Sequence, residues 1–518
     1  MSGIEDLSQR WGGSYKWLVT FTVMMGTIST TATATIANVA LPYIAGQFSL
    51  GADETQWVST AFLAAMTGTM LVTAWATDTF GQKTAFMGAI AVFVLGSLVG
   101  FAATSGNMVI LGRILQGAAA GFIQPQAMAM IFSVFPKEQR GLAMGIYGVG
   151  IVLAPALGPT VGGIMVDNYS WRYVFLVAIP FCVTGFLTSP IFLPDRDANV
   201  PKRGFDWLGF ILITVFLVSL LSTIANGQRE GWDSPSIFWG WVVAIASGTA
   251  FAAWEMTTAR PMLDVAVLGF WRFAAGCVVA LMLGTGIYGS TYLVPLFVET
   301  VQGYSPTSSG ILLMPAGIVL GAVFPLSGAL SDKLPPRWPI MAGLFCFGVS
   351  CLLLSGVHVD SPFWQLAWWI TLGRVGLGLI LPSMNVGALR ALPMAYVSQG
   401  SGVLNFFRQF GGALGVNLLA MMVDRRAFFH SHHLAESLTW GNRAVFYLIQ
   451  RLSETLVHWG NPFGTPAVGE IHPGALPFLA RMVIPKAFMK SYQDGFMLVA
   501  IAFFLAIIPA WFMKEKKE

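Results

Sequence analysis

Long apolar runs alternate with short polar segments along almost the whole chain. A helix of about 20 apolar residues crosses the hydrocarbon core of a bilayer, and a helix satisfies its own backbone hydrogen bonds there. The pattern therefore predicts an all-α polytopic membrane protein with fourteen transmembrane helices. We place these spans at residues 17–44, 55–77, 84–103, 107–133, 141–166, 171–193, 206–226, 237–258, 272–298, 308–331, 338–357, 363–389, 396–423 and 490–513.

The composition agrees with this prediction. Of the 518 residues, 55% are hydrophobic and 10% are charged, whereas about a quarter of a typical soluble chain is charged. Basic residues form no stripe outside short loops, which argues against a nucleic-acid-binding surface. The four cysteines lie in apolar runs, where cysteine behaves as a small hydrophobic residue. We expect no disulfide framework, no metal site and no bound cofactor.

The distribution of basic residues sets the orientation. If the N-terminus is cytoplasmic, Lys and Arg recur in the inside segments, whereas the short outside loops hold only Arg172 and Arg229. Short cytoplasmic loops carry an excess of Lys and Arg. We therefore predict a multi-pass protein with both termini in the cytoplasm.

One predicted outside loop is long, from about residue 424 to 489. Residues 443–459 show the apolar spacing of an amphipathic helix, which would lie on the membrane surface, bind a partner or cap its own bundle. His430, His432 and His433 lie near it, but no acidic or cysteine ligand accompanies them. A solvated face is the favoured interpretation over a metal site.

The chain repeats itself. The pattern Leu-Gly-Arg with a following Gly at residues 111–117 recurs at 372–378, so that Arg374 is the repeat mate of Arg113. Asp78 before a basic loop recurs as Asp332. Two parallel repeats are a common plan of transporters. We predict an N-terminal six-helix half at 1–195, an inserted helix pair at 196–265 and a C-terminal six-helix half at 266–518.

A stretch rich in glycine and proline, GVGIVLAPALGPTVGG, occupies residues 148–163 of the fifth span. Gly and Pro weaken a helix in water, but in lipid small residues let a neighbouring helix approach closely and Pro kinks the axis. This predicts a hinge or a seam between helices, with a plain packing face as the alternative. The residues concerned are Gly150, Ala154, Pro155, Gly158, Pro159, Gly162 and Gly163.

Three arginines, Arg113, Arg374 and Arg408, fall inside predicted spans. A charge at the centre of a bilayer costs at least about 2.5–3.5 kcal/mol, so it is usually functional or paired. The alternative is a structural arginine bonded to the carbonyls of a neighbouring helix. The loop from Asp78 to Lys83 joins two spans, and an ion pair formed there in one conformation only would act as a switch.

These motifs together resemble the major facilitator superfamily, and within it the fourteen-span drug:proton antiporters of the EmrB/QacA type. The Gly/Pro stretch resembles the antiporter motif of helix five, and Arg113 with Gln116 and Gly117 resembles the helix-four motif. Asp78, Gly81 and Lys83 match the gating loop. Residues 35–42, TIANVALP, resemble the first-helix signature, and residues 405–415 around Arg408 resemble a segment of the fourteen-span branch.

The resemblance implies a function. It implies proton-coupled export of hydrophobic or amphipathic compounds by alternating access, with protons as the coupling ion, Arg113 linked to that coupling and Asp78 with Lys83 in gating. The long outside loop resembles that of members that work in tripartite pumps. This implies a bacterial inner membrane, a periplasmic membrane-fusion adaptor and an outer-membrane channel as partners.

The first span departs from the family pattern. The signature normally carries an acid where this chain has Thr33, and a hydroxyl cannot carry the proton. We find no acidic residue near the middle of any predicted span. Our hypothesis is that Glu299, near the end of a span, supplies the missing titratable group, and the alternative is a solvated carboxylate at a helix end.

Polar residues between the two halves are candidates for the substrate path. Deformable Met and aromatic walls suit varied hydrophobic ligands, although they suit helix packing equally well. The candidates are Thr31, Thr33, Asn38, Gln116, Gln124, Tyr288, Tyr292, Asn385 and Asn405. No nucleophile–base pair, metal-ligand set or phosphate loop indicates an enzyme, and the alternative function is a dedicated exporter of one metabolite, such as a siderophore or a fatty acid.

Overall fold

The computed structural model describes residues 2–196, 204–258, 261–437, 443–458 and 475–513. Helices hold most of these residues, and none of the described residues lies in a β-strand. Eleven of the described helices are long and apolar enough to cross a membrane, or twelve if a bent pair counts as one span. The prediction of an all-α polytopic fold is confirmed. The number of described helices that meet this criterion is lower than the fourteen spans predicted.

The first group of helices contains a long helix, α2, that this criterion leaves out. Helix α2 is rich in threonine, which lowers its hydropathy, but the hydroxyls donate to backbone carbonyls one turn back, as Thr27 does to Val23 at 2.9 Å. Such back-bonding satisfies a hydroxyl inside an apolar bundle. The helices of this group are α1 (Ser2–Trp11), α2 (Tyr15–Phe48), α3 (Ala52–Met70), α4 (Thr73–Phe80), α5 (Gln82–Phe101), α6 (Gly106–Val134), α7 (Arg140–Asn168) and α8 (Ile179–Phe192).

Two further helices, α9 (Trp207–Glu230) and α10 (Pro235–Thr257), pack against each other. Helix α9 also contacts α3 of the first group and α16 of the last group. The Phe216 and Phe410 rings, for example, lie 6.0 Å apart between α9 and α16. The inserted pair therefore lies along one side of the junction between the two groups. The division of the chain into two halves and an inserted pair at 196–265 stays a prediction.

The second group of helices resembles the first in its packing, with long helices packed against several others. Glycines allow the close crossings: a Cβ on Gly376 would lie 2.6 Å from the Gly343 carbonyl oxygen, and a Cβ on Gly112 would lie 2.8 Å from that of Gly96. The helices are α11 (Val265–Gly269), α12 (Trp271–Thr300), α13 (Pro306–Lys333), α14 (Arg337–Leu354), α15 (Phe363–Arg390), α16 (Val397–Ser437), α17 (Arg443–His458), α18 (Ala475–Leu505) and α19 (Ile507–Trp511).

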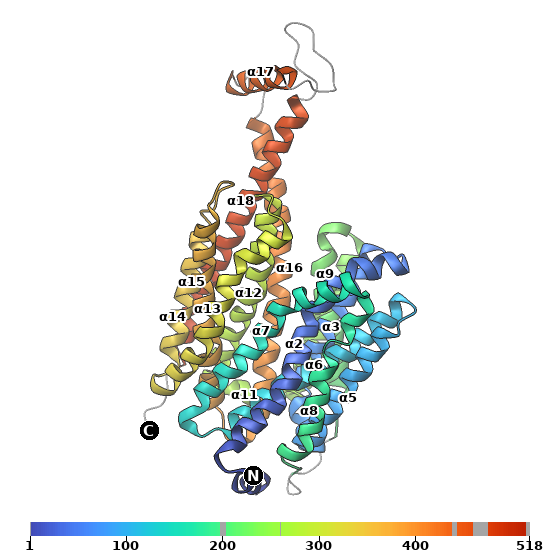
Figure 1. Cartoon of the computed structure of the whole chain (residues 1–518), viewed down its shortest axis with the longest axis vertical. Helices are drawn as coiled ribbons and strands as arrows, with labels where there is room; N and C mark the ends of the chain where they lie inside the picture. The colour runs from blue at the N-terminus through green and yellow to red at the C-terminus, as the bar shows by residue number, and fades with distance from the viewer. Residues whose placement is uncertain (1, 197–203, 259–260, 438–442, 459–474, 514–518) are drawn as a thin grey trace.

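Much of the segment 424–489, predicted as a long outside loop, is helical. Helix α16 continues to Ser437 and α18 begins at Ala475, so that both project past the other helices, and α17 lies beyond them (Figure 1). Charged residues join the two projecting helices, because Asp494 of α18 accepts from Arg426 Nε at 2.5 Å and lies 2.8 Å from His430 Nε2 of α16. The amphipathic helix predicted at 443–459 is confirmed as α17, and residues 438–442 and 459–474 lie outside the described part.

The two ends of the bundle are distinct. Helices α1 and α19 lie at one end, called here the termini end, and α17 lies at the other, called the α17 end (Figure 1). The two groups meet where α7 contacts α13 and α15 and where α6 contacts α16. These contacts form the seam between the halves, where the candidate site lies.

Candidate functional site

The carboxylate of Asp332 holds the halves together at the termini end. It lies at the end of α13 and accepts hydrogen bonds from the backbone N–H groups of Gly141 (2.7 Å) and Leu142 (3.0 Å) at the start of α7. A carboxylate at a helix N-terminus is favoured by the unpaired N–H groups and the helix dipole. Arg390 pairs with Asp332 at 3.2 Å and donates to the Lys137 carbonyl at 2.9 Å, so the clamp joins both halves twice.

Glycines bring α7 and α13 into contact beside this clamp. A Cβ on Gly328 would lie 2.8 Å from the carbonyl carbon of Gly141 and 3.2 Å from the Cα of Gly145. A Cβ on Gly145 would lie 3.0 Å from the Cα of Pro325. The two backbones touch, and no side chain fits between them. This contact is compatible only with glycine on both helices.

Further contacts between the two halves lie on the side of the bundle toward the termini end. The hydroxyls of Thr77 and Ser398 are 3.0 Å apart, and the Asn405 amide lies 3.1 Å from the Met128 sulfur. The Asn38 and Tyr288 side chains, in contrast, are exposed. The structure is therefore closed at the termini end.

A buried cation lies at the inner limit of this closed region. Arg408 is 3% exposed, donates to the Asn405 side-chain oxygen at 2.5 Å and lies against the Tyr147 hydroxyl of the other half. Tyr147 in turn donates to the Gln124 carbonyl at 2.9 Å. A charge buried without a carboxylate is costly, so this polar cluster from both halves is the strongest candidate for a functional centre. Tyr288, whose hydroxyl donates to Gln409 at 3.0 Å, lies beside it.

Arg113 matches the structural alternative considered for it. Its guanidinium donates to the backbone carbonyls of Val58 (3.1 Å) and Thr33 (3.3 Å) and to Gln116 Oε1 (3.2 Å), and it lies 4.0 Å from the centre of the Phe62 ring. These contacts link α2, α3 and α6 inside the N-terminal half. They satisfy the charge without an acid, and the predicted role in proton coupling stays a prediction.

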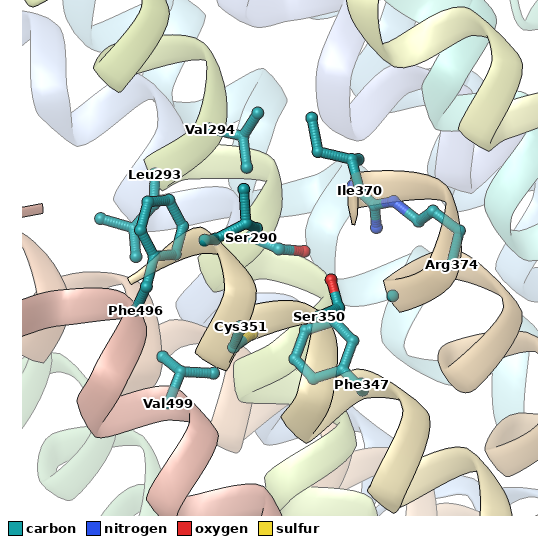
Figure 2. Close-up of a pocket in the computed structure, with 12 residues that line it drawn as sticks. Ser290, Leu293, Val294, Phe347, Ser350, Cys351, Ile370, Arg374, Phe496 and Val499 are labelled. Carbon is teal, nitrogen blue, oxygen red and sulfur yellow. The ribbon is translucent and has the colours of Figure 1, made fainter. Parts of the chain in front are cut away.

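Arg374 is placed differently from its repeat mate. It is half-buried on α15, donates to the Thr291 hydroxyl at 3.3 Å and borders a cavity inside the C-terminal half (Figure 2).

The gating loop is clamped within its own half. Lys83 forms an ion pair with Asp195, and Arg196 Nε donates to the Asp78 backbone carbonyl at 3.2 Å. The clamp across the seam comes instead from Asp332, the repeat mate of Asp78. Asp332 was not predicted as a site residue, although the repeat pointed to its position.

The glycines of the antiporter motif face α2 rather than the other half. A Cβ on Gly162 would lie 3.1 Å from the Ile36 carbonyl oxygen, and Gly150 and Gly158 face Met24 and Thr35 of the same helix. A Cβ on Gly163 would meet no heavy atom within 4 Å. In this conformation the predicted seam between halves is therefore made by earlier glycines of α7, and the motif packs inside the N-terminal half. The side chains of Pro155 and Pro159 lie outside the described part.

The nine predicted substrate-path residues separate into two groups. Thr31, Thr33, Gln116, Gln124, Asn385 and Asn405 are buried, and the hydroxyls of Thr31 and Thr33 donate to carbonyls of their own helix at 2.8 Å. Both side-chain polar atoms of Asn385 lack a hydrogen-bond partner among the described residues. Three members reach an accessible surface: Asn38, Tyr288 and Tyr292.

Three carboxylates, those of Glu299, Asp424 and Asp494, lie within long helices of the bundle. Glu299 is half-buried in the last turn of α12 and forms no ion pair with another described residue. Asp424 was placed at the start of the long loop and Asp494 near the start of the last predicted span, and both lie within long helices. Asp494 is level with the end of α12, because the adjacent Tyr492 accepts a hydrogen bond from Thr300 at 3.2 Å. Across the part of the chain that the structure describes, no group of three metal-ligating side chains gathers anywhere.

Two helical bundles that close on each other at one end, with a buried cation at their seam, are typical of a two-half membrane transporter. The chain belongs to the Major Facilitator Superfamily, whose family model matches residues 23–416. This membership indicates a transporter rather than an enzyme.

Relatives of known name support this assignment. The chain is 26% identical to the multidrug export protein EmrB of Haemophilus influenzae, over 96% of this chain and 95% of that protein. It is 25% identical to the fatty acid resistance protein FarB of Neisseria gonorrhoeae, over 97% of each. The human organic anion transporter MFSD10 shares the fold with a TM-score of 0.59 at 12% identity, covering 96% of this chain and 99% of that one. The predicted resemblance to EmrB-like exporters is confirmed.

Proposed function

We propose that the protein is a proton-coupled exporter of hydrophobic or amphipathic compounds that works by alternating access. The observation that carries this proposal is the one-sided seam, in which Asp332, Arg390 and the α7–α13 glycines close the termini end. A transporter of two rocking halves needs a closure that forms in one state and opens in the other. With the termini in the cytoplasm, the present conformation faces outward.

The proposal includes fourteen spans in a bacterial inner membrane. Helices α2 and α7 lie in the bundle beside the eleven or twelve helices that meet the criterion of length and hydropathy. The basic residues at Lys137, Arg337 and Arg390 all lie at the termini end, as the excess of positive charge on cytoplasmic loops favours.

Proton coupling without an acid in the first helix needs another titratable group. Glu299 is the titratable group that the sequence analysis put forward. Arg408 is a permanent positive charge, and its contacts with neighbouring groups would change in a rearrangement driven by protonation. The experiment is uptake into vesicles that contain the purified protein and hold an inside-acid pH gradient, with cationic dyes and amphipathic acids as substrates. We expect uptake that collapses when the gradient is removed, and Glu299→Gln to weaken its dependence on pH.

Uptake at the same rate with and without the pH gradient would contradict proton coupling but not the export function. Wild-type pH dependence in Glu299→Gln would remove Glu299 from the proposal and leave the exporter function standing. Absence of any transport by folded protein would contradict the function itself.

The projecting arm of α16, α17 and α18 is proposed as the docking element for a periplasmic adaptor, and through it for an outer-membrane channel. Exposed apolar side chains on α17, including Tyr447 and Leu448, support this role. Deletion of residues 438–474 is expected to leave the bundle folded and to abolish both adaptor pull-down and drug resistance. Retention of both would contradict the partnership.

A second candidate is a dedicated exporter of one metabolite. The relative named as a fatty acid resistance protein favours an amphipathic acid. Competition among structurally unrelated compounds separates the two functions: a broad pump is inhibited by many of them, and a dedicated exporter by close analogues of one compound.

A further inference from the structure

One carboxyl group is buried where the inserted helix pair leads into the second group of helices. Glu255, in the last turn of α10, is 4% exposed, and no other Asp or Glu that the structure describes is buried as deeply. Its Oε2 accepts a hydrogen bond from the backbone N–H of Leu263 at 3.1 Å. Its Oε1 is buried too and has no hydrogen-bond partner. A negative charge on that oxygen is costly, because nothing replaces the water it has lost.

A second carboxyl group faces the same point. Asp206 lies just before α9 and accepts from the Gly209 backbone N–H and from the Trp254 indole N–H, each at 2.9 Å. A Cβ on Gly209 would lie 3.0 Å from Glu255 Oε1 and closer still to Asp206 Oδ2. The two carboxyl groups therefore approach each other beside Gly209, which has no side chain to keep them apart.

No basic group neutralises this pair among the residues that the structure describes. The charged groups that face Glu255 are Asp206, from the start of α9, and Asp264, from the segment between α10 and α11. Both are acidic, and the Asp264 side chain caps α11 by accepting from the Ala266 N–H at 2.9 Å. Two carboxyl groups that share a buried place without a cation do not both stay ionised.

We propose that Glu255 and Asp206 form a proton-binding site that holds one proton on Glu255 Oε1, with the O–H donating to Asp206. Asp206 receives two N–H donors and Glu255 receives one, so the remaining negative charge is better placed on Asp206. A metal ion fits the site less well, because Ca²⁺ and Mg²⁺ take about six or more oxygen ligands. In the described part of the chain, no third metal-ligating side chain completes the pair.

The bound proton would hold the inserted pair against the segment that follows it. Glu255 binds the Leu263 N–H, and Met262 and Val267 on either side are buried in the core. Loss of the proton leaves two negative charges in one buried place, which favours movement of this segment away from α9. Helix α11 lies toward the termini end (Figure 1), so the site would respond to pH on that side of the membrane. The inference goes beyond the proposed function, which uses neither carboxyl group.

Infrared spectroscopy of the full-length protein in lipid bilayers tests the site directly, because the C=O stretch of a protonated carboxyl group is separate from the bands of a carboxylate. Exposed Asp and Glu side chains have pKa values of about 4 and are ionised at neutral pH. We expect a protonated-carboxyl band in the wild type at neutral pH and a weaker band or none in Glu255→Gln. Glu230→Gln, which changes an exposed glutamate at the other end of the helix pair, is the matched control and should keep the whole band. A wild type without the band, or Glu255→Gln with the full band, would overturn the proposal.

Asp206→Asn tests whether the two carboxyl groups act together. The asparagine oxygen can still accept from Gly209 and Trp254, but the neighbouring negative charge is gone. In a pH titration, the band of this variant should disappear at a pH at least about one unit lower than in the wild type, because a nearby like charge favours the protonated form. A titration that matches the wild type would overturn the paired site.

A metal cation would compete with the proton for the same oxygens. Addition of Na⁺, K⁺, Mg²⁺ or Ca²⁺ at constant pH and ionic strength should leave the wild-type band unchanged. Loss of the band with any of these ions would overturn the proton assignment and identify a cation site.

Hydrogen exchange connects the proton to the movement of the segment. After correction for the intrinsic pH dependence of exchange, residues 261–268 of the wild type should exchange faster above the pH at which the band is lost. Glu255→Gln should show no such step, because its side chain cannot ionise. A step of equal size in Glu255→Gln would overturn the link. These experiments need neither a substrate nor a pH gradient, so their failure leaves the exporter function untouched.

Discussion

Three arginines lie inside the bundle, and each meets the cost of its charge in a different way. Arg113 uses backbone carbonyls, Arg408 uses Asn405 and a tyrosine from the other half, and Arg374 donates to the Thr291 hydroxyl. The carbonyls around Arg113 belong to its own half, so these contacts can persist when the halves separate. The contact between Arg408 and Tyr147 joins the two halves, so it breaks when the seam opens. The position of an arginine in the sequence predicts none of this, because the acceptors come from other helices.

Asp332 makes a testable contribution to the closed seam. Asp332→Asn removes the negative charge that two N–H groups of α7 and Arg390 share. Hydrogen bonds to a charged group contribute about 1.5–3 kcal/mol, so a loss of about 2 kcal/mol would shift the closed–open equilibrium roughly thirtyfold. Hydrogen exchange of residues 140–148 should become faster and export should fall.

The matched control for this change is Asp195→Asn, which removes an ion pair with Lys83 inside one half. The Asp195 side chain is 79% exposed, and exposed pairs contribute little. Exchange at the start of α7 should stay at the wild-type rate. An equal effect of both variants would mean that Asp332 does not act through the seam.

Arg408 is expected to matter for transport more than for folding. Arg408→Gln keeps a polar side chain that can bond Asn405 but removes the charge beside Tyr147. We expect export to fall at least about tenfold while the thermal unfolding temperature changes by only a few degrees. Efflux and thermal unfolding measured on the same preparation test this, and a variant that exports at the wild-type rate would exclude a functional centre at the cluster.

At the level of helices, the sequence predicts those parts that hydropathy controls. The span predicted at 363–389 appears as Phe363–Arg390, and that at 107–133 as Gly106–Val134. The predicted bounds of α16 and α18 are too short, because Arg426 and His430 look like loop residues until their pairing with Asp494 of another helix is known. The predicted location of the seam is wrong for a similar reason. The glycines that form it, such as Gly328, are recognised only by their contacts with the other half.

Glycine at 328 is expected to be essential for closing the seam. Gly328→Val places atoms against the carbonyl carbon of Gly141 and the Cα of Gly145, where a backbone leaves no room. Overpacking of this kind costs about 1–3 kcal/mol, and it acts only on the closed state. Export should fall, and exchange at the start of α7 should become faster, with the protein still inserted.

Gly321→Val, on the same helix, is the control. A Cβ there meets no heavy atom within 4 Å. Exchange at the start of α7 should match the wild type in this variant. If Gly321→Val loosens the start of α7 as much as Gly328→Val does, the cause is the valine in α13 rather than the contact between helices.

For the whole molecule, the two halves contribute differently to the seam. The N-terminal half holds its arginine rigidly among carbonyls and receives the Asp332 carboxylate at the start of α7. The C-terminal half supplies that carboxylate and the Arg408 cation. The repeat in the sequence predicts equivalent halves, but Arg113 and Arg374 make different contacts, and so do Asp78 and Asp332.

A reversible covalent lock would show whether the closed seam must open during transport. The hydroxyls of Thr77 on α4 and Ser398 on α16 are 3.0 Å apart and join the two halves at the termini end. Cysteines at both positions should form a disulfide in the present conformation, since short distances between side chains are what such a bond requires. Alternating access then predicts that the oxidised Thr77→Cys, Ser398→Cys protein exports nothing, that a reductant restores export, and that each single variant exports with or without oxidant. An oxidised double variant that still exports at the rate of the reduced one would mean that substrates cross without separation of the halves, because a disulfide outlasts many transport cycles.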